Sequence, residues 1–261
     1  MMLGSIIGDL AGSIYEYGQI SEYKPIIINK IIEENSFYSD DTILTVAIAD
    51  AIINKKDYVS VLKQYVKDFS GYLPDYFPYF KTTFSPNFMK WANSNEIGNS
   101  HGNGAMMRIA PVGFLFNSEK EVVENVKLAT APSHNSFEAI SSATTIALII
   151  FYFRLGLSKN DVISKLNLNI VKPIVEKFNY TCETTLPICL YSIFNSNSFE
   201  NAILLAISFG GDTDTNACIV GGMAEALYGI ENSLKLQAIK KMPSKFQKII
   251  NQYYEKIDGK H

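Results

Sequence analysis

One stretch decides the fold class of this chain: residues 39–52, which read SDDTILTVAIADAI. From Ile43 to Ile52 its apolar residues fall at positions i, i+1, i+4, i+5, i+8 and i+9, which lie on one face of an α-helix. Ser39 and Asp40 precede this face, and both residue types are preferred at helix N-caps. The same helical spacing recurs over most of the 261 residues, whereas sustained strict alternation is hard to find. We therefore predict an all-α protein.

Start and stop signals predict further helices along the chain. We expect about a dozen of them in a single domain spanning residues 1–261, with strand character only in the short stretch 25–28. The signals are a capping box at residues 118–121 opening a helix to about Ala129, starts at Ser158 and Ser198, and a last helix from Ser244 to Ile257 after Pro243.

Composition and charge exclude several classes of function. The chain is 47% hydrophobic and has a formal net charge of −3, which argues against a protein that binds nucleic-acid backbones. The apolar run 139–153 is shorter than a membrane span and suits a buried helix, and the start of the chain lacks the pattern of a signal peptide. Three cysteines without a C-x-x-C pair suit reduced, packed thiols. We expect a cytoplasmic monomer without membrane or nucleic-acid partners.

Two acidic segments depart from the pattern of ordinary helix surfaces. Residues 39–42 read SDDT and residues 210–215 read GGDTDT, and each segment stands directly ahead of an apolar helix. Capping alone would explain either segment, but a cap needs one side chain and each segment supplies a surplus. Carboxylates and hydroxyls at this density are the ligands that hard divalent cations prefer. An EF-hand is excluded because Ala217 and Met223 occupy the positions of its turn glycine and its glutamate.

The remaining candidate residues lie near two glycine-rich segments. Gly4, Gly8 and Gly12 form a smooth helix face for close packing, which makes Asp9 and Glu16 acids on or just after a tightly packed helix. Such acids have perturbed pKa values and are site candidates. Residues 102–108, GNGAMMR, form a turn that could hold a phosphate or only pack, and we expect Arg108 to be buried against loop carbonyls. The aromatics of 76–84 could stack on an adenine or pack under a loop. His134 is predicted to begin a long helix.

Taken in order, five blocks of this sequence resemble the ADP-ribosylglycohydrolase family. They cover residues 8 to 215, and the glycines that follow continue in the family's manner. Ser39 stands where many members have threonine, and this change keeps the hydroxyl. The blocks are Gly8-Asp9-x-x-Gly12-x-x-x-Glu16, Ser39-Asp40-Asp41-Thr42, Gly102-Asn103-Gly104-Ala105-x-Met107-Arg108, Ser133-His134, and Gly210-Gly211-Asp212-Thr213-Asp214-Thr215.

The resemblance implies an all-α fold with two divalent cations, Mg²⁺ or Mn²⁺, at the floor of an ADP-ribose cleft. By position, it implies metal ligands at Ser39, Asp40, Asp41, Asp212, Asp214 and Thr215. It implies catalytic roles for Glu16, Asp41 and Asp214. It places Gly102, Asn103, Gly104, Ala105 and His134 near the ADP-ribose.

The implied activity is hydrolysis of the glycosidic bond between ADP-ribose and an acceptor, and an arginine side chain of a protein is the acceptor we expect. A second interpretation keeps the cleft but takes serine-linked ADP-ribose, O-acetyl-ADP-ribose or another small ADP-ribose conjugate. A third is an ADP-ribose-binding protein without turnover, against which the retention of Glu16 and both aspartate pairs counts.

Overall fold

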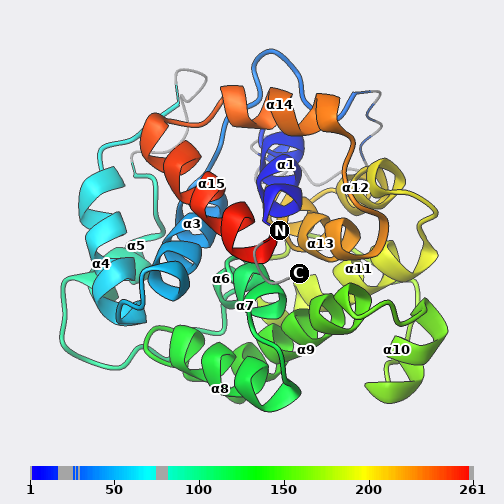
Figure 1. The fold of residues 1–261 in the computed structure, drawn as a ribbon, viewed down its shortest axis with the longest axis horizontal. Coiled ribbons are helices and arrows are strands. Elements are labelled where there is room, and N and C mark those ends of the chain that lie inside the picture. Colours follow the sequence, from blue (N-terminus) through cyan, green and yellow to red (C-terminus); the bar gives the residue numbers. More distant parts are fainter. Residues whose placement is uncertain (1, 17–25, 27, 29, 75–81, 259–261) are drawn as a thin grey trace.

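The computed structural model describes residues 2–16, 26, 28, 30–74 and 82–258, and it is helical, as the sequence predicts. Within the described residues, β-structure is confined to two isolated bridges, Asn99 with His134 and Gly102 with Thr181. The prediction of strand character at 25–28 includes positions outside the described residues. The helices, shown in Figure 1, are α1 (Leu3–Gly12), α3 (Asp40–Ile53), α4 (Tyr58–Phe69), α5 (Pro86–Ala92), α6 (Gly104–Met107), α7 (Ala110–Leu115), α8 (Glu119–Thr130), α9 (Phe137–Arg154), α10 (Lys159–Lys165), α11 (Cys182–Asn195), α12 (Phe199–Ser208), α13 (Thr213–Tyr228), α14 (Asn232–Lys240) and α15 (Ser244–Asp258).

Hydroxyl side chains begin several of these helices, as their sequences predict. The Ser39 Oγ accepts the backbone N–H of Asp41 at the start of α3, and Ser158 opens α10 with a complete capping box. The side chains of Ser118 and Ser198 cap α8 and α12 by accepting the backbone N–H groups of Glu121 and Asn201. At the capping box predicted for residues 118–121, the Glu121 carboxylate accepts the backbone N–H of Asn117 instead of that of Ser118. One start needs correction: α9 begins at Phe137 behind Ser136, whose side chain accepts the Ala139 N–H, so His134 lies before the helix and not in it.

The predicted glycine face of α1 packs against α13 near the centre of the molecule (Figure 1). A Cβ atom added to Gly4, Gly8 or Gly12 would lie 2.1, 1.9 or 2.3 Å from a backbone carbonyl oxygen of α13. Only glycine allows this approach at the three positions, because a methyl group would overlap backbone atoms that no rotamer change can move. The contact brings Asp9 of α1 next to the first turn of α13.

A buried carboxylate fixes the other end of the same helix pair. Glu225, on α13, accepts the backbone N–H of Gly4 at 2.8 Å and the Tyr254 hydroxyl at 2.8 Å. Gly4 lies in the first turn of α1, where backbone N–H groups have no partner within the helix. A negative charge there also interacts favourably with the helix dipole. Glu225 therefore joins α1, α13 and α15 at one point.

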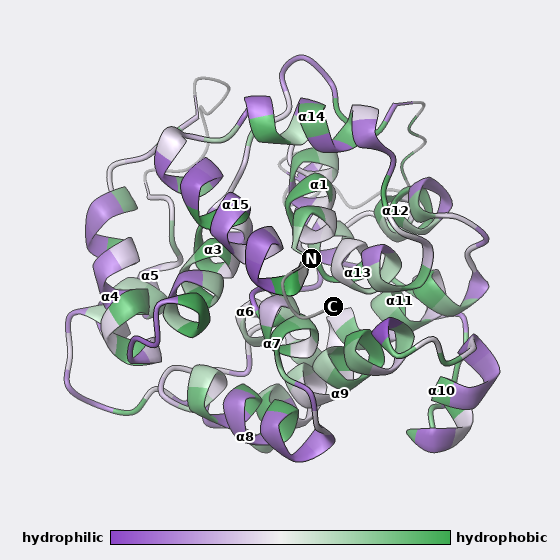
Figure 2. Ribbon diagram, viewed as in Figure 1, coloured by the Kyte–Doolittle hydropathy of each residue, from purple (hydrophilic) through white to green (hydrophobic). Residues whose placement is uncertain are grey.

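Hydrophobic residues face the interior, and hydrophilic residues lie on the outer faces of peripheral helices such as α8 and α10 (Figure 2). The apolar run that the sequence assigns to a buried helix is α9, which packs against α7, α8, α11 and α13. Its 18 residues have a mean hydropathy of 1.3, enough by length and composition to cross a membrane, and 56% of them are buried within the fold. The three cysteines are buried and free, as predicted.

Candidate metal centre and substrate cleft

A cleft of about 760 Å³ opens at the N-terminal ends of α3 and α13. Segments far apart in the sequence form its walls, and its acidic part comes from three of them: the segment that follows α1, the start of α3 and the start of α13. The lining residues are Glu16, 37–41, Leu44, 72–74, 82–88, Trp91, 98–104, Met107, Arg108, Ser133, His134, Tyr180, Thr181, Asp212, Asp214 and Thr215.

Asp9 supports the start of α3 from behind the cleft. Its Oδ2 atom accepts the backbone N–H groups of Ser39 at 2.9 Å and Thr42 at 3.0 Å. These two bonds fix the turn that carries Asp40 and Asp41. The side chain of Asp9 is fully buried and does not line the cleft, so it acts here as a scaffold for the candidate ligands.

The first turn of α13 meets the first turn of α3 across the floor of the cleft. The Thr215 hydroxyl donates to Asp41 Oδ2 at 3.2 Å, and the Ser39 hydroxyl donates to the same oxygen at 3.3 Å. Asp214 accepts the backbone N–H of Thr215 at 2.8 Å. The two acidic segments therefore converge, which their separation in the sequence could not show.

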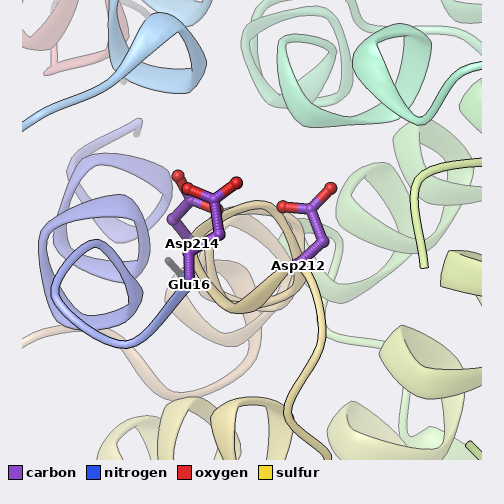
Figure 3. Close-up of side chains that lie close together, drawn as sticks. All are labelled: Glu16, Asp212 and Asp214. Carbon is purple, nitrogen blue, oxygen red and sulfur yellow. The ribbon is translucent and has the colours of Figure 1, made fainter. Parts of the chain in front are cut away.

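Glu16 joins this group from the segment that follows α1. One carboxylate oxygen from each of Glu16, Asp212 and Asp214 lies within 4.8 Å of the other two (Figure 3). In Figure 3, Glu16 and Asp214 lie together on one side of the start of α13, and Asp212 lies on the other side. Glu16 is half-buried and lines the cleft, whereas Asp212 and Asp214 are buried. The structure thus places the predicted catalytic acid within reach of two predicted ligands.

Burial and mutual repulsion raise the pKa values of the clustered aspartates. Burial, followed by the charges of Asp214 and Asp9, raises the pKa of Asp40 to about 8. Burial and the Asp214 charge raise the pKa of Asp9 to about 7. The pKa values of Asp41 and Asp214 lie well above their usual range, and that of Asp212 is also raised, with burial as the largest cause in each case. Neighbouring carboxylates cannot all be charged at neutral pH without a compensating cation.

The donor set fits hard divalent cations. The ligand atoms are oxygens of carboxylates and hydroxyls, which Mg²⁺ and Mn²⁺ prefer. Asp41 Oδ1 is buried and has no hydrogen-bond partner, which leaves one unsatisfied acceptor at the floor of the cleft. Both observations agree with cation binding, and neither is explained by helix capping: Asp212, the N-cap of α13, makes no side-chain cap hydrogen bond.

The glycine-rich turn at 102–104 lines the cleft, but its residues differ in what they offer. The Nδ2 atom of Asn103 is engaged within the protein, since it donates to Asp212 Oδ2 at 2.7 Å and to Thr185 Oγ1 at 3.2 Å. Ala105 does not line the cleft and its side chain is fully buried in α6, so the expectation of a substrate contact there does not carry over to the side chain. Gly102 and Gly104 remain on the wall.

His134 presents one ring nitrogen to this turn. Its Nδ1 lies 2.8 Å from the Ser133 hydroxyl and 3.5 Å from Arg108 Nη2, and the guanidinium can only donate. Nδ1 therefore accepts, and the proton lies on Nε2, which faces Gly102 and Gly104. Burial and the Arg108 charge hold the pKa of His134 well below its usual range. The result is a neutral N–H donor in the cleft wall.

Arg108 is buried as predicted, and its Nε and Nη1 atoms have no hydrogen-bond partner among the described residues. Its Nη2 donates to Ser133 Oγ at 2.7 Å and to the Ala129 carbonyl at 3.4 Å. Its guanidinium lies 5.4 Å from the centre of the Phe88 ring. Phe88 and Trp91 line the same wall with ring centres 5.1 Å apart. Most of the aromatic residues that were expected to stack on an adenine or pack under a loop lie at 76–80, outside the described residues.

Sequence reasoning missed Asn179 and Thr185. Asn179 lies in the irregular segment between α10 and α11, is buried, and accepts the backbone N–H of Asp212 at 3.0 Å. Thr185, on α11, accepts hydrogen bonds from Asn179 and Asn103. Neither belongs to a recognisable motif, and only the folded arrangement brings them to the acidic cluster.

Comparisons with known proteins agree with the resemblance of the motifs. Residues 1–260 match the model of the ADP-ribosylglycohydrolase family. The ADP-ribosylhydrolase ARH3 of Mus musculus is 21% identical over 88% of this chain and 83% of its own length. The ADP-ribosylarginine hydrolase Tri1 of Pseudomonas putida is 27% identical over 49% of this chain and 39% of its own.

A solved structure shares the fold. It is described as an ADP-ribosylglycohydrolase-related protein complex and has a TM-score of 0.74 to this chain. The similarity covers 98% of this chain and 96% of that chain at 17% sequence identity.

Proposed function

The chain belongs to the ADP-ribosylglycohydrolase family, and we propose that it hydrolyses the glycosidic bond between ADP-ribose and an arginine side chain of a modified protein, using two divalent cations. The observation that carries this proposal is the convergence of the two acidic segments and Glu16 at the floor of one cleft. A cleft of about 760 Å³ is of the size that encloses a ligand such as ADP-ribose.

In the proposal, Ser39, Asp40 and Asp41 hold one cation, and Asp212, Asp214 and Thr215 hold the other, either Mg²⁺ or Mn²⁺. When bound, such cations orient a hydrolytic water and the ribose hydroxyls and neutralise the clustered carboxylates. Asp9 and Asn103 hold the ligand segments in place through the hydrogen bonds described above.

Glu16 supplies the proton transfer. The water oxygen forms a bond to the anomeric carbon, and the bond from that carbon to the acceptor nitrogen breaks with its electron pair on the nitrogen. The Glu16 carboxylate takes the proton from water, and a proton returns to the departing guanidine. The positive charge that develops on the ribose resembles an oxocarbenium ion.

His134 orients the ligand in the proposal. Its neutral Nε2–H donates a hydrogen bond toward the turn at Gly102 and Gly104, where a phosphate or ribose oxygen would accept it. The buried ring also excludes water from this wall.

Arginine is proposed as the acceptor because the Pseudomonas putida relative is named for that linkage.

The test is release of free ADP-ribose from arginine-linked peptides, serine-linked peptides and O-acetyl-ADP-ribose in the presence of Mn²⁺. The proposal expects the fastest release from the arginine linkage, and loss of release in Asp214→Asn but not in Asp161→Asn, an exposed acid on α10. Faster release from another linkage would replace the acceptor and retain the hydrolase. Calorimetric binding of ADP-ribose without any release would show a binding protein instead.

A further inference from the structure

Asp212 is held from two sides by a buried polar network in which Asn179, Thr185 and Asn216 lie outside the sequence motifs. Its carboxylate accepts Asn103 Nδ2 at 2.7 Å, and its backbone N–H donates to Asn179 Oδ1 at 3.0 Å. Thr185 Oγ1 accepts the Nδ2 groups of both asparagines, at 3.2 and 2.9 Å. Asn179 Nδ2 also donates to Asn216 Oδ1 at 2.8 Å. The Thr185 hydroxyl thereby connects the residue that bonds the Asp212 carboxylate to the residue that bonds its backbone N–H.

The backbone before Asp212 is shaped to receive Asn179. Gly210 and Gly211 have φ values of 70° and 74°, a region that favours glycine. A Cβ atom on Gly211 would lie 2.1 Å from Asn179 Oδ1, so a side chain at that position would block the amide. Glycine at 211 therefore lets the Asn179 oxygen reach the Asp212 N–H.

These contacts satisfy the buried amide of Asn179. Its oxygen accepts from Asp212 N and, at 3.5 Å, from Asn216 Nδ2, and its nitrogen donates to Thr185 and Asn216. These partners fix the orientation of the Asn179 amide, and the amide in turn fixes the backbone N–H of Asp212. Asp212 begins α13 without a side-chain cap hydrogen bond. Its carboxylate is bonded by Asn103, with further hydrogen bonds to Asp214 and Thr215, and its backbone N–H is bonded by Asn179.

We propose that Asn179 is a positioning residue that holds the Asp212 backbone in place for a divalent cation, and that Thr185 links it to Asn103, which directs the Asp212 carboxylate. This inference rests on the proposed function, because it takes Asp212 to be a ligand of a divalent cation. Asn179 does not line the cleft in the described structure, so its effect passes through Asp212. Hydrogen-bonded partners of metal ligands typically contribute about 10- to 100-fold to metal affinity.

The test is calorimetric titration of Mn²⁺ into the apo protein, with circular dichroism as the check of folding. Asn179→Ala is expected to raise the dissociation constant for Mn²⁺ by about 10- to 100-fold. Asn195→Ala is the matched control: the side-chain amide of this exposed asparagine donates to the Tyr191 carbonyl of its own helix, α11, and its removal should leave Mn²⁺ affinity unchanged.

Two substitutions of Thr185 test the same network without the loss of side-chain volume that Asn179→Ala causes. Thr185→Val keeps the shape but removes the acceptor shared by the two asparagines, and it should weaken Mn²⁺ binding. Thr185→Ser restores the hydroxyl and should recover the wild-type affinity. If Thr185 only filled space in the core, the Mn²⁺ affinity would not depend on its hydroxyl, and Thr185→Ser would not bind Mn²⁺ more tightly than Thr185→Val.

The outcomes separate the inference from the proposed function. Wild-type affinity within twofold in Asn179→Ala, or equal affinities in Thr185→Val and Thr185→Ser, overturns the positioning role and leaves the hydrolase intact. Absence of Mn²⁺ binding by the wild type overturns both. If Asn179→Ala fails to fold, the Thr185 pair decides the matter.

Discussion

Replacing Gly8 with alanine places a methyl group where α1 and α13 already touch. The added Cβ would lie 1.9 Å from the carbonyl oxygen of Ala217 and 2.3 Å from its carbonyl carbon. Ordinary contact begins at 3.4 Å, so the two helices would need to separate by about 1.5 Å. Because the clash involves backbone on both sides, no side-chain rotation relieves it.

The free energy of unfolding of Gly8→Ala should fall by about 2 kcal/mol. Overpacking a dense interior costs about 1 to 3 kcal/mol, and a backbone clash belongs at the upper end. Alanine offsets about 1 kcal/mol of this through its higher helix propensity. For a chain of this size, the net cost corresponds to a decrease in melting temperature of about 4 to 8 °C.

The measurement is thermal unfolding followed by calorimetry, with Gly71→Ala as control. Gly71 is exposed, and a Cβ there would meet nothing within 4 Å, so this variant should melt with the wild type. The same separation would move Asp9 away from the start of α13, so Gly8→Ala should also bind Mn²⁺ more weakly. Equal melting temperatures for Gly8→Ala and the wild type would refute the close-packing argument.

Three further predictions concern single side chains. Glu16→Gln should keep ADP-ribose binding in calorimetry and slow release of ADP-ribose by about 100-fold or more, whereas full activity would remove Glu16 from proton transfer. His134→Ala should weaken ADP-ribose binding by about 10-fold, the value of one hydrogen bond, and an unchanged affinity in calorimetry would contradict a hydrogen bond from this ring. Burial raises the pKa of Glu225 above its ordinary value of 4.5, so the folded state binds this proton more tightly than the unfolded state. The free energy of unfolding therefore falls as the pH rises from 4.5 through the pKa of the folded state. Denaturant titrations of Glu225→Gln should therefore lack this part of the pH dependence, and a pH profile identical to that of the wild type would contradict it.

The fold could be predicted because its signals are local. Ser39 before an apolar face, and glycines at every fourth position from Gly4, each specify a helix or a packing surface without knowledge of distant residues. The candidate ligands were also visible, since the surplus of acids at Asp40, Asp41, Asp212 and Asp214 exceeds what capping needs.

The supporting contacts could not be predicted because they depend on tertiary structure. Asn179 and Thr185 are ordinary residues of a loop and a helix until folding places them beside Asp212. Asn103 belongs to a predicted ligand-binding turn, yet its amide is bonded to Asp212. His134 was expected to begin a helix, but Ser136 takes the cap, and the ring remains on the cleft wall.

The most direct test of the central claim follows ADP-ribose release from an arginine-linked substrate through one cycle of metal removal and return. The wild-type protein should release ADP-ribose with Mn²⁺, stop when a chelator removes the cation, and recover its rate when Mn²⁺ is restored. A release rate that is unchanged by the chelator would contradict the assignment of the converging carboxylates as a catalytic cation site.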